Sequence, residues 1–222
     1  MATTAEVRRC TRICGEPMRG SPVPERDTMS RKRNERKESM HYLSHYESPL
    51  GTMTMASDGE HLTGLWFDGQ KYDRSTIDDD AVLQPRLPVF TQTAQWLDAY
   101  FEGADPGFTP PIRVEGSDFK KMVSSTMLSI PFGATSTYAR IAAEVARRMG
   151  RKQMSAQAVG GAVGRNPIVL IVPCHRVLAS DGSLRGYAGG VDRKERLLEM
   201  EGVNVSGLLT PPAADDGGGR RE

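Results

Sequence analysis

A cysteine and a histidine stand side by side at Cys174 and His175, directly after an apolar, β-branched run. A thiol beside a titratable imidazole can be activated as thiolate, which is the form that attacks electrophiles. Pro173 has no amide proton and pushes the residue before it towards an extended backbone. We therefore predict a strand that stops at Pro173 and presents Cys174 at its tip. From this pair alone, a buried structural cysteine beside a surface histidine is an equal alternative.

The predicted strand also bears on how the two side chains meet. Neighbouring residues of a strand point to opposite faces, so His175 is not expected to contact the Cys174 sulfur, and a water would bridge them. A protonated imidazole nearby would lower the pKa of the thiol. A thiol hydrolase or acyltransferase needs an oxyanion hole and usually a directly bonded Cys–His pair, so this geometry disfavours that class.

Apolar residues at helical spacing predict three helices before the cysteine, at residues 119–130, 138–149 and 156–164. Ser155 is placed to cap the third helix. The last two helices and the polar turn between them have helix-turn-helix proportions. Alanine and glycine make up most of the third helix, which is explained either by close packing against another helix or by close approach to DNA.

Earlier in the chain the pattern is that of strands. Residues 41–46 predict a strand, and residues 57–60 have the composition of a hairpin turn between two further strands. Residues 89–102 predict a helix, with Gly103 as its C-terminal cap. We therefore expect a small antiparallel sheet with one helix, followed by a proline-rich linker near residues 106–111.

The expected organisation is an α+β chain in four parts. Residues 1–40 are rich in Arg, Glu, Ser and Pro and poor in large apolar side chains, which predicts a disordered basic extension. Residues 41–113 are expected to form an α/β domain and residues 114–206 a mostly helical domain that carries the cysteine. Residues 207–222 are expected to form a disordered tail.

Composition narrows the class of protein. Lys and Arg number 29 against 28 Asp and Glu, so any surface for nucleic acid must be local. Three cysteines do not make a disulfide framework, which favours a reducing, cytoplasmic setting. No apolar run approaches membrane-spanning length. Cys10, Cys14, His41 and His45 have zinc-like spacings, but four strand residues span ~13 Å, which is too far for one ion, so we expect no metal site.

Several segments taken together resemble the methylated-DNA–protein-cysteine methyltransferases, the 6-O-alkylguanine-DNA alkyltransferases. These segments are residues 155–162, 165–167, 173–177 (Pro-Cys-His-Arg-Val), 186–190 and 194–202. The resemblance is most specific from about residue 130 to residue 202 and looser back to residue 41. It implies a ribonuclease H-like N-terminal part and a winged-helix-like C-terminal part with a helix-turn-helix.

The resemblance also implies an activity. Cys174 would take a methyl or larger alkyl group from oxygen-6 of guanine, with oxygen-4 of thymine as a further candidate, in double-stranded DNA. The transfer would follow base flipping and occur in a single irreversible turnover. No cofactor is implied, and the sequence contains neither a G-x-G-x-x-G motif nor a P-loop. The protein is expected to act as a monomer.

Residue roles follow from the resemblance position by position. His175 and Glu195 match the residues that activate the thiol through a bound water, although a capping box from Asp192 to Glu195 would also explain that glutamate. Tyr138 matches a tyrosine that donates towards N3 of the leaving guanine. Asn166 matches an asparagine that braces the turn before the active site. The implied DNA- and base-contacting positions are Ser155, Gln157, Arg165, Asn166, Val177, Tyr187 and Ala188.

Gln157 departs from the family pattern. Many relatives carry an arginine there, which fills the gap left by the flipped guanine. Glutamine can still hydrogen-bond the orphaned cytosine, but it has no charge and less reach. Because base flipping costs free energy that such contacts offset, we expect weaker DNA affinity or slower repair.

A non-catalytic DNA-damage sensor is the other alternative function, and such a protein would have no use for a reactive thiol at Cys174.

Overall fold

The computed structural model of the protein describes residues 40–77, 80–206 and 208. The predicted disordered segments, 1–40 and 207–222, lie outside this part of the chain except for Met40 and Leu208. Cys10 and Cys14 also lie outside it. In the described residues, no helix is long and apolar enough to cross a membrane.

The N-terminal half is built on a four-stranded sheet with strand order β3-β2-β1-β4. β1 (Tyr42–Ser48), β2 (Gly51–Ser57) and β3 (Leu62–Phe67) are antiparallel neighbours, and the predicted hairpin turn joins the last two. β4 (Val82–Leu83) pairs with β1 in parallel. The sheet is therefore mixed, whereas we expected a purely antiparallel one. The difference arises because the chain leaves β3 through a series of turns and returns at the far edge beside β1.

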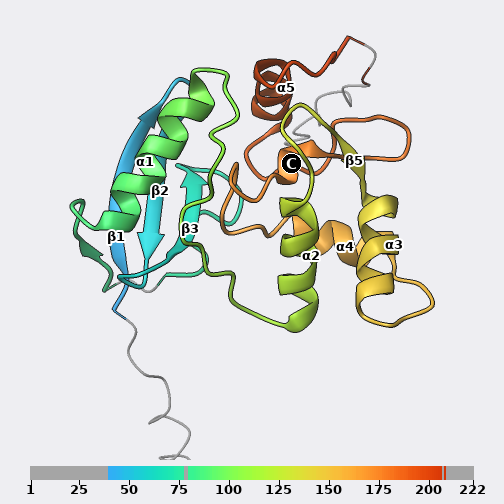
Figure 1. The fold of residues 1–222 in the computed structure, drawn as a ribbon, viewed down its shortest axis with the longest axis horizontal. Helices are drawn as coiled ribbons and strands as arrows, with labels where there is room; N and C mark the ends of the chain where they lie inside the picture. Colours follow the sequence, from blue (N-terminus) through green and yellow to red (C-terminus); the bar gives the residue numbers. More distant parts are fainter. Residues whose placement is uncertain (1–39, 78–79, 207, 209–222) are drawn as a thin grey trace, which may run out of the picture. The chain divides into compact units, whose positions relative to one another are not determined.

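α1 (Pro88–Phe101) packs on this sheet, as the helical spacing predicted (Figure 1). Proline begins the helix, where its missing amide proton has no cost. Gly103 follows the last turn with φ of +83°, a left-handed conformation that glycine adopts without a Cβ clash. Phe90, Leu97 and Tyr100 are buried on the inner face of the helix.

The C-terminal half is mostly helical, as predicted. The helices are α2 (Asp118–Leu128), α3 (Tyr138–Arg148), α4 (Ala156–Val163) and α5 (Val191–Met200). The side chains of Thr137 and Ser155 accept from the amides of Arg140 and Ala158 at the starts of α3 and α4, which contact each other as a helix-turn-helix does. A short parallel pair, β5 (Ser136–Thr137) and β6 (Val177–Leu178), was not predicted.

The segment before Cys174 is not the predicted strand. Residues 168–172 form turns with one isolated bridge to Leu65, and Leu170 has φ of +67°. Cys174–Arg176 then form a single turn of 3-10 helix, η2. The run is apolar because it is buried, with each of its residues at most 5% exposed, and short apolar runs do not distinguish a strand from other buried segments.

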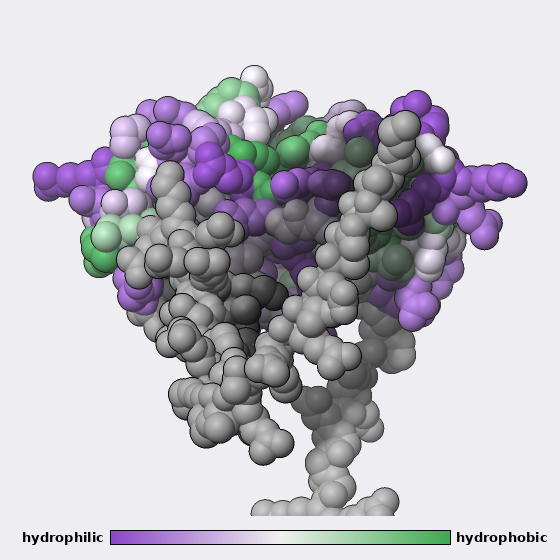
Figure 2. All heavy atoms as spheres, turned by 90° about the horizontal axis from the view of Figure 1, so that it is seen from below, coloured by the Kyte–Doolittle hydropathy of each residue, from purple (hydrophilic) through white to green (hydrophobic). Residues whose placement is uncertain are grey.

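One continuous core joins the two halves. Its buried side chains run from Met53 in β2 to Leu197 in α5, and the backbone of β3 hydrogen-bonds the segment before Cys174 through Leu65 and Pro167. The N-terminal half therefore directly supports the segment that carries the cysteine. Hydrophilic side chains are widespread on the face seen in Figure 2, with hydrophobic ones in smaller patches.

Candidate active site

Cys174 lies just beneath the surface and is 4% exposed. Its sulfur accepts a hydrogen bond from Asn166 Nδ2 at 3.1 Å. The same amide nitrogen donates to the carbonyls of Ile168 (3.2 Å) and Val172 (2.7 Å), and Asn166 Oδ1 accepts from the Ile168 amide at 3.1 Å. Asn166 thus ties the turn after α4 to the thiol and holds the sulfur in place.

Burial raises the pKa of the Cys174 thiol, while the Asn166 hydrogen bond and the charge of Lys194 oppose that rise. The sequence-based expectation that a protonated His175 lowers the pKa of this thiol is therefore wrong. Burial lowers the pKa of His175 despite the carboxylate beside it, so the imidazole is neutral near pH 7. The cation near the sulfur is an ammonium group.

Lys194 is that cation, and it was not predicted as a site residue. It is fully buried on α5, and its Nζ donates to the carbonyls of Val177 at 2.6 Å and Arg185 at 3.0 Å. Burial lowers the pKa of Lys194 to about 8, against the attraction of a Cys174 thiolate. A buried lysine on an otherwise amphipathic helix is a recognisable signal only once the helix face is known.

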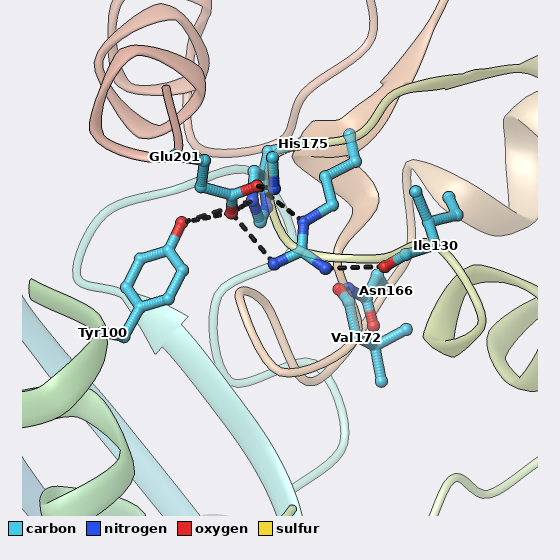
Figure 3. A network of polar contacts seen from close by, with 8 residues as sticks. Tyr100, Ile130, Asn166, Val172, His175 and Glu201 are labelled. Atoms are coloured by element: carbon cyan, nitrogen blue, oxygen red, sulfur yellow. Dashed lines mark hydrogen bonds and ion pairs between the residues drawn. The ribbon is translucent and has the colours of Figure 1, made fainter. Parts of the chain in front are cut away.

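The carboxylate partner of His175 is Glu201, and not Glu195 as predicted (Figure 3). Glu201 Oε1 lies 2.6 Å from His175 Nε2, and both side chains are fully buried. An ionised carboxylate only accepts, so Nε2 must carry the proton and Nδ1 is left as the acceptor of a neutral imidazole. Among the described residues, nothing hydrogen-bonds this buried Nδ1.

Glu195 does not take the predicted role, which belongs to Glu201, six residues further along the chain. The predicted capping box is also absent, because α5 begins at Val191 after Gly190 and makes no side-chain cap. Glu201 caps the other end of the same helix. The sequence places two glutamates near this helix, and only the tertiary structure shows which one reaches His175.

Glu201 collects donors from both halves of the protein (Figure 3). Tyr100 of α1 donates to Oε1 at 2.8 Å, and its hydroxyl also lies 3.3 Å from His175 Nε2. Arg176 donates to both carboxylate oxygens at 2.8 and 3.0 Å, and the Gly133 amide donates at 3.2 Å. Burial would raise the pKa of Glu201, but the hydrogen bonds from His175 and Arg176 and the charge of Arg176 lower it to about 2.

Two tyrosines stand near the sulfur. Burial, and then the charge of a Cys174 thiolate, raises the pKa of Tyr138 to about 12 and that of Tyr187 well above its usual value. Both are therefore proton donors near pH 7. The Tyr138 hydroxyl donates to the Arg185 carbonyl at 3.1 Å. Gly186, at φ +79°, is needed beside it because a Cβ there would lie 2.5 Å from this hydroxyl.

A cavity of about 350 Å³ opens next to these tyrosines. It is lined by Lys71, Tyr72, Gly160, Gly161, Gly164, Arg165, Gly186, Tyr187 and Ala188. Cys174 does not itself line the cavity, but Tyr187 does and also lies within reach of a thiolate charge at Cys174. The volume is of the size that ligand pockets have.

The glycines of α4 form part of this cavity wall. A Cβ on Gly160 would make ordinary contact with the Tyr138 ring at 3.9 Å, and one on Gly161 would lie 3.7 Å from Arg165 Nη1. Tyr138 is the first residue of α3, but at this distance it leaves room for a side chain on Gly160, and no other helix is recorded against Gly161. Of the two explanations for this glycine-rich helix, close packing against another helix does not require glycine at Gly160 or Gly161.

Three of the other predicted binding residues lie on the same helix or at its ends. Ser155 serves as the N-cap of α4, and Gln157 and Arg165 are exposed beside a second cavity of about 430 Å³. Val177 is buried, and its carbonyl already accepts from Lys194. The Ala188 carbonyl accepts from the Lys71 amide at 3.1 Å. The structure thus brings Arg165 and Ala188 together at the first cavity and Gln157 and Arg165 at the second, while Val177 lies in the core.

Comparison with known proteins accounts for both halves of the chain. Residues 41–114 match the family model of the 6-O-methylguanine DNA methyltransferase ribonuclease-like domain, and residues 118–203 match that of its DNA binding domain. The chain is 38% identical over 171 residues to the methylated-DNA–protein-cysteine methyltransferase of Mycobacterium tuberculosis, covering 77% of this chain and 98% of the relative. It is 40% identical over 165 residues to that of Methanosarcina barkeri, covering 74% and 99%.

Solved structures are similar as well. The crystal structure of Mycobacterium tuberculosis OGT in complex with DNA matches with a TM-score of 0.63 and 37% identity, covering 72% of this chain and 92% of that chain. The methyltransferase from Methanococcus jannaschii matches with a TM-score of 0.51 and 29% identity, covering 73% and 93%. A buried thiol backed by a His–Glu pair, on a ribonuclease-like and a helix-turn-helix half, defines a cysteine alkyl-acceptor protein. The chain belongs to the methylated-DNA–protein-cysteine methyltransferase family.

Proposed function

We propose that the protein repairs DNA by direct reversal, moving an alkyl group from oxygen-6 of guanine to its own Cys174. One observation carries the proposal: the Cys174 sulfur accepts from Asn166 and is influenced by the charge of Lys194, and Tyr187, which lies within reach of that sulfur's charge, lines a cavity walled by the glycines of α4. An acceptor sulfur needs a group that stabilises its anion and a path for an extruded base. These residues supply the first, and the cavity supports the second.

The reaction proceeds by in-line displacement. The Cys174 thiol loses its proton towards His175 Nδ1 through a bound water, and the sulfur attacks the alkyl carbon. A carbon–sulfur bond forms as the carbon–oxygen bond breaks, and the electron pair leaves with the purine. Glu201 holds the His175 proton at Nε2, so that Nδ1 remains the basic nitrogen.

The leaving guanine takes up a proton. Tyr138 keeps its proton near pH 7 because its pKa is raised to about 12, and it is the donor proposed for N3 of the base. The Ala188 amide faces oxygen-6 in this proposal, and the Cys174 and Val177 carbonyls accept from the exocyclic amine. The thioether product is not reversed by thiol exchange, so each protein molecule acts once.

A thiol hydrolase remains the alternative class, and the contacts of the site do not favour it. The Cys174 sulfur accepts from Asn166, and His175 Nε2 is occupied by Glu201 and Tyr100. A directly bonded Cys–His pair, the usual device of that class, would require His175 to turn away from its buried carboxylate.

The proposal includes the setting in which the protein acts. In this proposal the protein acts as a monomer on double-stranded DNA. The acceptor must remain a free thiol, which favours a reducing compartment such as the cytoplasm. Exposed Gln157 on α4 would occupy the gap left by the flipped base.

The test is a mass measurement on the product. The protein is incubated with duplex DNA carrying a single 6-O-methylguanine, and its intact mass and the modified peptide are determined. We expect one added methyl group on Cys174 per protein molecule, without turnover, and none on Cys174→Ala. An unmodified wild-type protein, or a methyl group on another residue, would refute the proposal. A parallel duplex with 4-O-methylthymine tests the second lesion.

Gly161→Leu separates DNA binding from folding. The side chain would project from the open face of α4, and leucine is a better helix former than glycine, by roughly 1 kcal/mol. We expect the free energy of unfolding to stay the same or rise, while the rate of methyl transfer from duplex DNA falls at least tenfold. Gln95→Leu, on the exposed side of α1, adds a similar side chain away from the cavity and should leave the rate unchanged.

A further inference from the structure

The cavity of about 350 Å³, which is proposed to take the extruded base, is lined in part by two residues from the ribonuclease-like half. Lys71 and Tyr72 line it together with Gly160, Gly161 and Arg165 of the helix-turn-helix half. Both are exposed, and Tyr72, at 39% exposure, is one of the few large hydrophobic side chains exposed among the described residues. None of the roles described above uses them.

The loop that carries these residues is held against the base-binding loop. The Lys71 amide donates to the Ala188 carbonyl at 3.1 Å. Gln70 is buried, and its side chain accepts from the Phe67 amide at 3.1 Å. Asp73 accepts from the Gly69 amide and so turns its carboxylate back into its own loop. The position of Tyr72 is therefore set by contacts on both sides of it.

Tyr72 is held in an unfavourable backbone conformation. Its φ is +65°, in the left-handed region where a residue with a Cβ is rare, and Arg74 two residues on has φ of +51°. Such conformations persist only where surrounding contacts enforce them, and they cluster at binding and active sites. Glycine would be the conformationally easier choice at this position. An aromatic ring at this position therefore indicates a use for the ring.

Two cations gather on the Tyr72 ring. Lys71 Nζ lies 5.1 Å from the ring centroid, and the Arg165 guanidinium lies 5.6 Å from it. The ring thus brings together one cation from each half of the protein at the mouth of the cavity. When a flipped base enters a pocket, its sugar and phosphates stay at the mouth, where basic side chains bind them.

We propose that Lys71 and Tyr72 form, with Arg165, a binding site for the backbone of the extruded nucleotide. Lys71 and Arg165 bind a phosphate that flanks the damaged base, and the Tyr72 ring packs against the sugar. The site deepens the proposed repair function and rests on it. It gives the ribonuclease-like half a direct contact with DNA.

The test pairs protein variants with DNA that lacks one charge. Single-turnover methyl transfer and DNA affinity are measured for the wild type, Lys71→Met and Tyr72→Gly. The substrates are duplexes with one 6-O-methylguanine and an uncharged methylphosphonate at each flanking position in turn. Arg86→Met removes an exposed cation from the same half away from the cavity and serves as the control.

We expect Lys71→Met to weaken affinity or slow transfer about five- to tenfold on the fully charged duplex. On the duplex whose methylphosphonate replaces the contacted phosphate, the wild type and Lys71→Met should differ by less than twofold. Tyr72→Gly should slow transfer at least fivefold while its resistance to unfolding stays the same or increases, because glycine relieves the left-handed backbone.

Three results would overturn the inference. Lys71→Met and Tyr72→Gly could react like the wild type on every duplex. Lys71→Met could lose the same factor on all duplexes, which would indicate an indirect role. Tyr72→Gly could slow transfer only in proportion to a loss of folding. A wild type that transfers no methyl group at all would instead refute the repair function itself, so the two failures are distinguishable.

Discussion

A Glu201→Gln protein should unfold more easily by about 3–5 kcal/mol, because removing one member of a buried charge pair leaves the other uncompensated. Arg176 donates to both oxygens of this carboxylate and has little exposure to water. Glutamine offers one acceptor and places two N–H donors where an oxygen had accepted. Since domains are stable by only roughly 5–15 kcal/mol, this is a large part of the total.

Methyl transfer by Glu201→Gln should also be slowed, at least tenfold, because His175 loses the carboxylate that fixes its tautomer. The measurements are urea unfolding and single-turnover transfer at a temperature where the variant remains folded. Glu195→Gln is the matched control on the same helix, and it should change both quantities little. If Glu195→Gln were the damaging change and Glu201→Gln the neutral one, the assignment of Glu201 would be wrong.

The pH dependence of stability gives the same carboxylate a second signature. Its pKa in the folded protein is about 2, below the usual 4.5. A lowered carboxyl pKa stabilises the fold above pH 4.5, and this stabilisation is lost as the pH falls from 4.5 towards 2. The difference in unfolding free energy between the wild type and Glu201→Gln should therefore shrink across that window. A difference that stayed constant would contradict the ion pair.

A Lys194→Met protein should transfer the methyl group at least tenfold more slowly near pH 7. Methionine keeps the length of the side chain and removes the cation that opposes the rise in the pKa of the Cys174 thiol. Each unit by which that pKa rises lowers the thiolate fraction tenfold. The profile of rate against pH should shift to higher pH, and the shift distinguishes an electrostatic role from a merely structural one.

The same variant allows a measurement that does not involve DNA. Reaction of Cys174 with iodoacetamide between pH 6 and 10 reports the thiol pKa directly, in a background where Cys10→Ser and Cys14→Ser remove the other thiols. Lys121→Met, on the exposed side of α2, is the control and should leave the profile unchanged. An unshifted profile in Lys194→Met would show that this ammonium does not act on the sulfur.

Local sequence signals were sufficient for most of the elements. The cap at Ser155, the turn before β3 and the glycine after α1 act within a few residues of themselves, and the structure has each of them. The motif around Cys174 was sufficient for the family. The segment before the cysteine was predicted wrongly as a strand, because apolar residues are equally suited to any buried backbone.

What the sequence by itself determined is therefore most of the elements, the acceptor cysteine and the family, since each depends on neighbouring residues or on a contiguous motif. The tertiary structure alone decided which groups act on that cysteine. Glu201, Tyr100 and Lys194 come from distant positions and meet at His175 and Cys174 only because α1, α5 and the core pack as they do. Burial then set their charges, leaving the imidazole neutral and placing the cation on a lysine, and no local pattern encodes burial.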